Sequence, residues 1–435
     1  MKRNLYIVLG LLVIVSMLAV ACGAKPTPTT PPPYQAKPSP TPEPTTPPEP
    51  TPTEAPKPVK ITIWHQWAGD YLAAIEQAFR DYEAAHPGVT IDLTKPDDVT
   101  AALKVAIPAG EGPDIIGWAN DQIGANALIG NIVPLDDYGI DQKFLESTYE
   151  PAAVKGVIWQ GKIWALPESQ EGIAFVYNKA LVTDEFLPKD PLNFDELLAK
   201  AKAFAEKNPG KYLVCNQGLG NPDAYHVAPI YFGFGLPGYV DDMGNVYMGS
   251  PESVKAAQWM VEFSKYAPKE TSHDICKGLL TEGKVGAWWT GPWAIADIEK
   301  AGIDYGIAPM GRPFVGIKTV MLCKNAVDRG NQDVALDIMK YYTSAEVQKK
   351  ITLVNKTIPA NTAALKDPEV QKLYTLAGFG ASLNLGVPMG NSPFANAQWG
   401  PVGDATTALW AGAQAPDAAM AAAKEAIEKA VAEMK

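Results

Sequence analysis

The alternation of apolar and polar positions predicts a series of strands and helices where the folded part of the chain begins. Residues 61–64 form a short run rich in β-branched side chains, and apolar residues recur at helical spacing over 70–85. Pro87 and Gly88 end this helix, and 89–93 is a second β-branched run. A strand, a helix and a strand in this order predict a βαβ unit with a parallel sheet.

The same pattern continues along the chain and indicates its fold class. A second helix over 98–106 leads to an apolar third strand over 114–118. The Ala-rich stretch 417–434 places apolar residues on one side of a helix. Further helix starts are indicated by Asn193 with Glu196 as a capping box, by Ser250 with Pro251, and by Ser344. Together these elements predict an α/β body, and we find no internal repeat.

The first 21 residues have the layout of a signal peptide. Lys2 and Arg3 precede an apolar run over 5–18, which is too short for a membrane-spanning helix. The small residues before Cys22 resemble the lipobox of bacterial lipoproteins, in which the cysteine carries the lipid. The alternative is an ordinary signal peptide cleaved after a small residue, with Cys22 incidental. We expect lipidation at Cys22 because of the segment that follows it.

Residues 22–58 are expected to form a disordered tether. Between Lys25 and Pro58 the chain is almost only Pro, Thr, Ala, Lys and Glu, and it contains 15 of the 39 prolines. Such a stretch lacks the apolar surface that would offset the entropy of ordering, and it favours extended polyproline II. At roughly 3 Å per residue it reaches roughly 100 Å as an upper bound. A lipid, a spacer and a folded body indicate a protein that works at the outer face of a cell membrane.

Size and charge limit the classes of partner for the remaining 377 residues. This length is enough for two domains. The formal net charge of the chain is −11, and the first 58 residues carry +2, so the body carries −13. A strongly acidic body argues against nucleic acid or anionic lipid as a partner. The body contains no run of 18 apolar residues and no Gly-x-x-x-x-Gly-Lys-Ser/Thr phosphate loop, so any ATP hydrolysis belongs to another chain.

Cysteines and histidines give no sign of a metal or redox site. The body has an odd number of cysteines, Cys215, Cys276 and Cys323, so at least one thiol is unpaired. The sequence leaves a Cys215–Cys276 bridge open, but we expect three small buried apolar side chains. The four histidines lack metal-ligand spacing. We therefore expect no metal and no cofactor.

Short motifs in a fixed order resemble one known family. The segment 112–121 reads Gly-Pro-Asp-Ile-Ile-Gly-Trp-Ala-Asn-Asp. It is followed by Trp-Ala-Leu-Pro at 164–167, Tyr-Asn-Lys at 177–179, Thr-Gly-Pro-Trp-Ala at 290–294, Pro-Phe-Val-Gly at 313–316 and Gln-Trp at 398–399. These motifs resemble the bacterial maltose/maltodextrin-binding proteins, the sugar-capturing receptors of ABC importers. The similarity runs from about residue 59 to the C-terminus.

The resemblance implies an α/β, two-lobed periplasmic-binding-protein-like fold of type II, with a hinge that the chain crosses more than once. Lobe one would comprise 59–168 and 316–366, and lobe two would comprise 169–315 and 367–435. The resemblance also implies a non-catalytic monomer. It would bind an oligosaccharide between the lobes, close by a hinge motion and deliver the sugar to ABC permease subunits in the membrane.

A sugar site needs aromatic plates for the C–H faces of the rings and polar groups for the hydroxyl rim. Trp118 and Asp121 follow the end of a strand, where α/β sheets bind ligands. For each candidate the alternative is a structural role, such as a core aromatic, a helix cap or a surface acid. By the resemblance, the sugar contacts are Gln66, Trp67, Trp118, Asp121, Glu171, Tyr225, Trp293 and Trp399. The neighbouring Trp288 and Trp289 are expected in the core.

Several positions depart from the pattern of this family. Trp67, Ala68 and Gly69 replace a local Asp-Lys after the first strand, and Gln122 replaces an arginine. After the last matching tryptophan, Gly400 and Gly403 replace a tyrosine and an arginine. These changes leave the identity of the sugar open. The acidic balance and the expected lack of basic residues in the cleft argue against phosphorylated cargo.

Two other functions are compatible with the same residues. A surface glycosidase would use a pair of carboxyl groups, either Glu168 with Glu171 or Asp121 with Glu171, but no sequence feature marks a proton donor. Alternatively, the fold and the receptor role stay the same and the cargo is another di- or oligosaccharide, such as trehalose.

Overall fold

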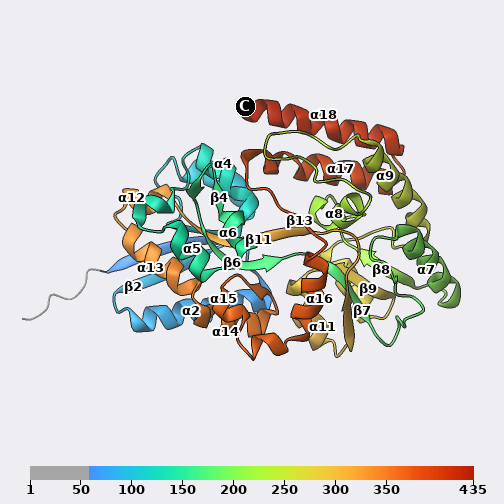
Figure 1. Cartoon of the computed structure of the whole chain (residues 1–435), viewed down its shortest axis with the longest axis horizontal. Helices are drawn as coiled ribbons and strands as arrows, with labels where there is room; N and C mark the ends of the chain where they lie inside the picture. The colour runs from blue at the N-terminus through green and yellow to red at the C-terminus, as the bar shows by residue number, and fades with distance from the viewer. Residues whose placement is uncertain (1–57) are drawn as a thin grey trace, which may run out of the picture. The chain divides into compact units, whose positions relative to one another are not determined.

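Two mixed β-sheets with helices around them, and one small hairpin, make up the folded part of the chain (Figure 1). The computed structural model describes residues 58–435, and for Asp70 only the backbone. The predicted signal peptide, the lipidation at Cys22 and the tether up to residue 57 lie outside the described residues. Over residues 58–435, no helix combines the length and the apolar character needed to cross a membrane.

The first sheet confirms the predicted βαβ unit. Its strand order is β12-β6-β11-β3-β1-β2, and β13 pairs with β11 off this path. β1 is parallel to both β2 and β3, whereas β11 runs antiparallel to β3 and β6. The strands are β1 (Val59–His65), β2 (Val89–Thr94), β3 (Ile115–Ala119), β6 (Leu166–Glu171), β11 (Phe314–Leu322), β12 (Ile358–Pro359) and β13 (Val387–Pro388).

The second sheet has the order β10-β7-β9-β8, in which β8 and β9 are parallel and β7 is antiparallel to both of its neighbours. The chain passes between the sheets within a few residues, from Glu171 to Ala174 and again from Ala308 to Phe314. The strands are β7 (Ala174–Asn178), β8 (Tyr212–Asn216), β9 (Val285–Thr290) and β10 (Tyr305–Ala308), and a separate hairpin joins β4 (Ile158–Trp159) to β5 (Lys162–Ile163). The crossings place the ends of β6 and β11 at the boundary between the two sheets.

Helices accompany each sheet in Figure 1. Those with the first sheet are α2 (Gly69–Ala85), α3 (Val99–Ala106), α4 (Ile123–Leu128), α5 (Gln142–Thr148), α6 (Pro151–Val157), α12 (Lys324–Asp328), α13 (Gln332–Tyr342), α14 (Ala345–Asn355) and α15 (Thr362–Leu365). Those with the second sheet are α7 (Phe194–Lys207), α8 (Ala224–Gly233), α9 (Pro251–Phe263), α10 (His273–Thr281), α11 (Ile295–Lys300), α16 (Tyr374–Leu383), α17 (Trp399–Trp410) and α18 (Pro416–Met434).

The predicted helix starts are confirmed, with one correction. The side chains of Ser250 and Ser344 each accept a hydrogen bond from a backbone N–H three residues on. Asn193 Oδ1 accepts from the backbone N–H of Glu196 at 2.9 Å. The Glu196 carboxylate does not return to Asn193 but accepts from the backbone N–H of Lys189 at 3.1 Å. Only half of the capping box forms, because the preceding loop presents its own donors to the carboxylate.

Both faces of the second sheet are buried, and this confirms the core positions of Trp288 and Trp289. Trp289 packs with Phe175 in the cluster on one face, and Trp288 packs with Val176 in the cluster on the other. Both indoles are fully buried. Adjacent residues of a strand point to opposite faces, so the pair is held in two separate cores.

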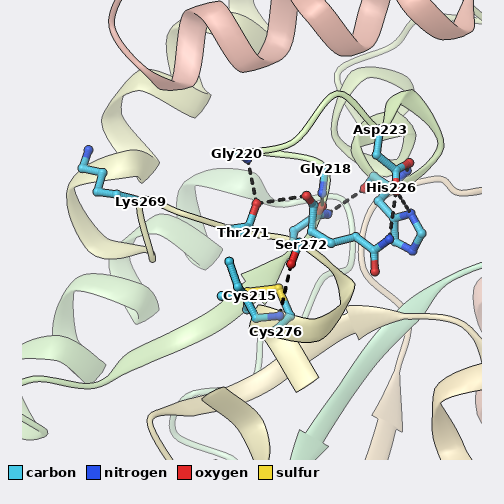
Figure 2. The surroundings of a disulfide bond; sticks show 12 residues. Cys215, Gly218, Gly220, Asp223, His226, Lys269, Thr271, Ser272 and Cys276 are labelled. Carbon is cyan, nitrogen blue, oxygen red and sulfur yellow. Dashed lines mark hydrogen bonds and ion pairs between the residues drawn. A yellow bond between two sulfur atoms is a disulfide. The ribbon is translucent and has the colours of Figure 1, made fainter. Parts of the chain in front are cut away.

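A disulfide joins Cys215 at the end of β8 to Cys276 on α10, across 61 residues of sequence (Figure 2). The expectation of three unpaired thiols is therefore wrong. The pairing depends on a Cα–Cα distance of 5.5 Å that only the packing of α10 against the sheet creates. Beside the bond, Thr271 accepts from the Gly220 N–H and donates to the Gln217 carbonyl. Cys323 is a buried free thiol.

Candidate ligand-binding cleft

Two adjoining cavities form a cleft where elements of the two sheets meet. One has a volume of about 290 Å³ and is called here the aromatic compartment. The other has a volume of about 460 Å³ and is called the polar compartment. Gln66, Glu171, Trp293 and Lys318 line both, so the compartments are parts of one cleft. Glu171 and Lys318 lie here because β6 and β11 run to the boundary between the sheets.

Four aromatic side chains from four different elements line the aromatic compartment. Trp118 lies near the end of β3, and Trp293 lies in the single turn of 3-10 helix over Pro292–Ala294 that follows β9. Tyr225 comes from α8, and Trp399 is the first residue of α17. The rings of Tyr225 and Trp293 are 6.2 Å apart, so they pack side by side in one wall. Flat aromatic rings of this kind can stack on a ligand that has apolar faces.

Asp121 is a buried carboxylate with one oxygen unused. Its Oδ2 accepts from Gln122 Nε2 at 2.9 Å and from Trp399 Nε1 at 3.1 Å. Its Oδ1 is buried without a hydrogen-bond partner among the described residues. Burial raises the pKa of Asp121 to about 6, although both donors favour the charged form. At neutral pH the free oxygen is therefore an acceptor that a ligand hydroxyl can satisfy.

Glu171 on β6 faces Lys318 on the neighbouring antiparallel strand β11. The Lys318 Nζ lies 3.8 Å from the Glu171 Oε2, and Glu171 is only 5 % exposed. Burial raises the pKa of Glu171, and the lysine charge opposes that shift. The pair provides one donor and one acceptor at the junction of the two compartments.

The polar compartment carries charges that the sequence did not indicate. Lys277 forms an ion pair with Asp297 at 2.6 Å, and Gln66 Nε2 is buried without a hydrogen-bond partner among the described residues. Burial lowers the pKa of His273, which keeps this imidazole neutral at pH 7. The expectation that the cleft lacks basic residues is wrong, because Lys277, Lys300 and Lys318 all line it. They come from α10, α11 and β11, and none of them belongs to a quoted motif.

Comparison with known proteins places the chain in a family. A model of the bacterial extracellular solute-binding proteins matches residues 77–378, which is more than half of the chain. The chain is a bacterial extracellular solute-binding protein. The match supports the resemblance predicted from the motifs.

This solute-binding protein has relatives with named ligands. It is 31 % identical over 357 residues to the maltotriose-binding protein of Pyrococcus abyssi, covering 79 % of this chain and 76 % of the relative. It is 25 % identical over 345 residues to the galactooligosaccharide-binding protein of Bacillus subtilis, covering 74 % and 78 %. These relatives are binding proteins and not enzymes, which confirms that the chain is non-catalytic.

Solved structures confirm the predicted fold. The maltose/maltodextrin-binding domain of Bdellovibrio bacteriovorus aligns with a TM-score of 0.77 at 23 % identity, over 86 % of this chain and all of that one. The maltotriose-binding protein of Thermus thermophilus aligns with a TM-score of 0.73, also at 23 % identity, over 85 % of this chain and all of that one. The solute-binding protein therefore has the two-lobed, type II fold.

Seven of the eight residues predicted to contact the ligand line the aromatic compartment of the solute-binding protein. They meet there because the ends of β1, β3 and β6 lie at one edge of the first sheet, opposite α8 and α17. Their contact with a ligand stays a prediction. The seven are Gln66, Trp118, Asp121, Glu171, Tyr225, Trp293 and Trp399.

Trp67 differs from the other predicted contacts. It borders the polar compartment, but its side chain is only 1 % exposed. Its ring stacks on His65 at 4.9 Å and packs against Tyr342 at 5.6 Å. This burial favours a role in supporting the wall of the cleft.

The positions that depart from the family pattern have separate structural roles. Gln122 donates to both Asp121 and Asn396 at 2.9 Å, so it ties the cleft carboxylate to the segment before α17. A side chain at Gly403 would meet the backbone of Pro222 at 2.8 Å, which requires a glycine there. Gly400 has open space around it and no such requirement.

Sequence reasoning missed several residues of the cleft. Lys318 lies on β11, two residues after the motif at 313–316, and Tyr71 lies on the first turn of α2, but neither belongs to a motif. His273 and Lys277 stand four residues apart on α10 and line the polar compartment together. Their helical spacing was the one available signal, but nothing in the sequence placed α10 beside the cleft.

Proposed function

We propose that this solute-binding protein is the receptor of a sugar ABC importer and binds maltodextrin-type oligosaccharides in the cleft. The observation that carries the proposal is the set of three tryptophans around two buried carboxylates. Trp118, Trp293 and Trp399 offer plates for the C–H faces of sugar rings. Asp121 and Glu171 offer buried acceptors for hydroxyl groups. A sugar ring has apolar faces and a rim of hydroxyl groups, so both features of the cleft suit it.

The comparison with Pyrococcus abyssi supports glucose-based cargo. That relative is a maltotriose-binding protein, and its identity of 31 % is well above that of the Bacillus subtilis protein. The size of the cleft also agrees with an oligosaccharide, because two adjoining compartments of about 290 and 460 Å³ exceed what a monosaccharide needs.

Another di- or oligosaccharide is the second candidate. The Bacillus subtilis relative binds galactooligosaccharide by name, and it covers nearly as much of this chain as the Pyrococcus protein does. Gln122, Gly400 and the polar compartment are the places where a different sugar would be selected. Trehalose belongs in the same test.

A calorimetric and fluorescence screen of residues 58–435 tests the function. Maltose, maltotriose, maltotetraose, trehalose and a galactooligosaccharide would be titrated at pH 7.5. We expect saturable binding of maltotriose or maltotetraose with a change in tryptophan fluorescence, because ligand replaces water beside the indoles. Strongest binding of trehalose or the galactooligosaccharide would favour the second candidate. If none of the five binds or raises the melting temperature, the sugar-receptor proposal is wrong.

We also propose that the lobes are 59–168 with 316–366 and 169–315 with 367–435, and that they close on the ligand. The crossings from β6 to β7 and from β10 to β11 support a hinge there, because they are the short connections between the sheets. Small-angle scattering should show a smaller radius of gyration with saturating maltotriose. An unchanged radius with ligand bound would argue against closure.

Lipid anchoring at Cys22, delivery to a permease and a monomeric state complete the proposal. The small residues before Cys22 support lipidation, and a Streptococcus pneumoniae relative, 26 % identical over 314 residues, is named a lipoprotein. Labelling with a fatty acid in a bacterial host should modify the full chain and not the C22S variant. Label on the C22S variant would show that the lipid is attached at another residue. Light scattering should give the mass of one chain.

A further inference from the structure

Tyr71 lies on the first turn of α2 and lines the polar compartment. Its hydroxyl donates a hydrogen bond to the Oε1 of Glu168. A phenol hydroxyl has one hydrogen to donate. Because the Tyr71 hydroxyl already donates it to Glu168, Tyr71 can only accept a hydrogen bond from a ligand, through its lone pairs. A ligand hydroxyl that reaches Tyr71 must then be the donor.

Glu168 is buried behind Tyr71 on strand β6. It is 3 % exposed, and its Oε2 has no hydrogen-bond partner among the described residues. Its position is held by the backbone, because the Glu168 carbonyl accepts from the Ala360 N–H at 3.0 Å. The chain has thus placed a carboxyl group where its side chain can act on Tyr71 without reaching the ligand.

Among the described residues, the groups facing Glu168 come from four elements, and Lys318 is the one cation in this set. They are Tyr71 from α2, Tyr342 from α13, Glu171 from β6 itself and Lys318 from β11. Burial, and to a smaller extent the nearby Glu171 charge, raise the pKa of Glu168 to about 7, although Tyr71, Lys318 and Tyr342 oppose the shift. The other titratable groups of the polar compartment are His273, Lys277, Asp297 and Lys300.

The two protonation states of Glu168 act differently on Tyr71. The ionised carboxylate can only accept hydrogen bonds, so it directs the Tyr71 hydroxyl hydrogen towards Glu168. It also strengthens a row of two hydrogen bonds, from the ligand hydroxyl to Tyr71 and from Tyr71 to Glu168. The protonated carboxyl has its own hydrogen and no charge, so this direction and strength are lost.

We propose that Tyr71 is a ligand contact in the polar compartment and that Glu168 is the positioning residue that makes its hydroxyl an acceptor for a sugar hydroxyl. The inference rests on the proposed function and names a residue pair that the motifs do not include. Both residues lie apart from the aromatic plates, so their contribution is separable from stacking.

The proposal has a pH dependence of definite sign. Ligand that donates to Tyr71 is held best when Glu168 is ionised, so binding lowers the pKa of Glu168 and releases protons. Affinity should therefore be highest above pH 7 and should fall as the pH drops towards 6. A shift of one pKa unit on binding corresponds to roughly a tenfold change in affinity. Asp121 and Glu171 are also ionisable groups of the cleft, so the pH dependence of the wild type alone does not identify Glu168. Comparison with a Glu168 variant isolates the contribution of this residue.

The test compares four proteins by calorimetry with maltotriose between pH 5.5 and 8.5. They are the wild type, E168Q, Y71F and the control Y82F. Tyr82 lies on the same helix and donates to Asp337 Oδ2 at 2.6 Å, and it does not line the cleft. Y82F therefore removes a similar tyrosine–carboxylate bond at a matched site. Melting temperatures check that all four fold.

We expect E168Q and Y71F to bind roughly tenfold more weakly than wild type at pH 8 and to lose most of the pH dependence, while Y82F behaves as wild type. An E168Q protein that retained the full pH dependence of binding, or a Y71F protein with unchanged affinity at pH 8, would overturn the inference about Tyr71 and Glu168. The sugar-receptor function would still stand. Absence of maltotriose binding by the wild type would instead overturn the maltodextrin function and this inference with it.

Discussion

The indole Nε1 of Trp399 donates to the Oδ2 of Asp121 at 3.1 Å, although 278 positions separate the two residues. The bond connects the 3-10 turn over Asn120–Gln122, which follows β3 of the first sheet, to the start of α17 beside the second sheet. An aromatic plate and a hydroxyl acceptor of the cleft are thereby held in one fixed geometry, with Asp121 Oδ1 left for the ligand.

A double-mutant cycle measures this coupling. We expect the single substitution W399F to weaken maltotriose binding by about 1–3 kcal/mol. The hydrogen bond to the charged Asp121 is lost, whereas an aromatic ring remains at position 399. In the D121N background the same change should cost less. Equal losses in both backgrounds, measured by calorimetry, would show that the Trp399–Asp121 bond does not organise the site.

Trp293 should contribute mainly by stacking. We expect W293A to weaken maltotriose binding by about 1–3 kcal/mol, because it removes a plate that Tyr225 supports from one side. Trp159 provides a matched control, since it is half-buried in β4, packs on Trp164 and lies outside the cleft lining. W159A should bind as wild type. If W293A also binds as wild type, the cleft is misplaced.

Trp67 should affect stability far more than affinity. W67A removes a fully buried ring from the first core, and we expect the free energy of unfolding to fall by about 3–5 kcal/mol. G117A should also destabilise the fold, because its Cβ would lie 2.7 Å from the Trp67 ring. Urea unfolding gives both values. A stable W67A protein without ligand affinity would return Trp67 to the set of ligand contacts.

Asp121 should make stability depend on pH. Burial raises the pKa of Asp121 from 3.8 to about 6, so the folded protein holds this proton more tightly than the unfolded chain. The stability contribution of this group is therefore highest below pH 4 and is lost as the pH rises to about 6. We expect D121N to raise the free energy of unfolding at pH 8 by on the order of 2 kcal/mol, and much less at pH 4. Equal unfolding free energies of D121N and wild type at pH 8 would contradict this.

The disulfide should stabilise the lobe that carries α10. Replacing Cys215 and Cys276 by serine opens a loop of 61 residues, and the chain-entropy model predicts a loss of about 4 kcal/mol. The melting temperature of the double variant should fall clearly below that of wild type. C323S is the control, since Cys323 is buried and unpaired and does not close a loop. A wild-type melting temperature unaffected by reductant, with thiol labelling confirming reduction, would show that the bond adds no stability.

Local periodicity was sufficient to predict β1, β2 and β3 of the first sheet, but not its other strands. The βαβ unit over 59–94 formed as expected, because its apolar spacing matches a strand, a helix and a strand without help from distant residues. The helix starts at Ser250 and Ser344 also depend on side chains and backbone only three residues apart. Four of the predicted contacts that line the aromatic compartment lie within the short motifs, namely Trp118, Asp121, Trp293 and Trp399, and the wider resemblance supplied Gln66, Glu171 and Tyr225.

The failures share one physical cause. The burial of Trp67 depends on Phe79 and Tyr342 packing around it, and the Cys215–Cys276 bond depends on where α10 lies. Lys277 and Lys318 entered the cleft through the same long-range packing. None of these outcomes is encoded in the spacing of neighbouring residues.

The sequence by itself determined the fold class, the first βαβ unit and seven of the side chains that line the aromatic compartment. The tertiary structure alone decided which groups surround each side chain. It therefore decided which carboxyl groups are buried and which hydroxyl groups already donate a hydrogen bond within the protein. Glu168 and Tyr71 are 97 positions apart and meet only after β6 and α2 have packed. Burial and hydrogen-bond direction are properties of three-dimensional neighbours, whereas periodicity is a property of the chain.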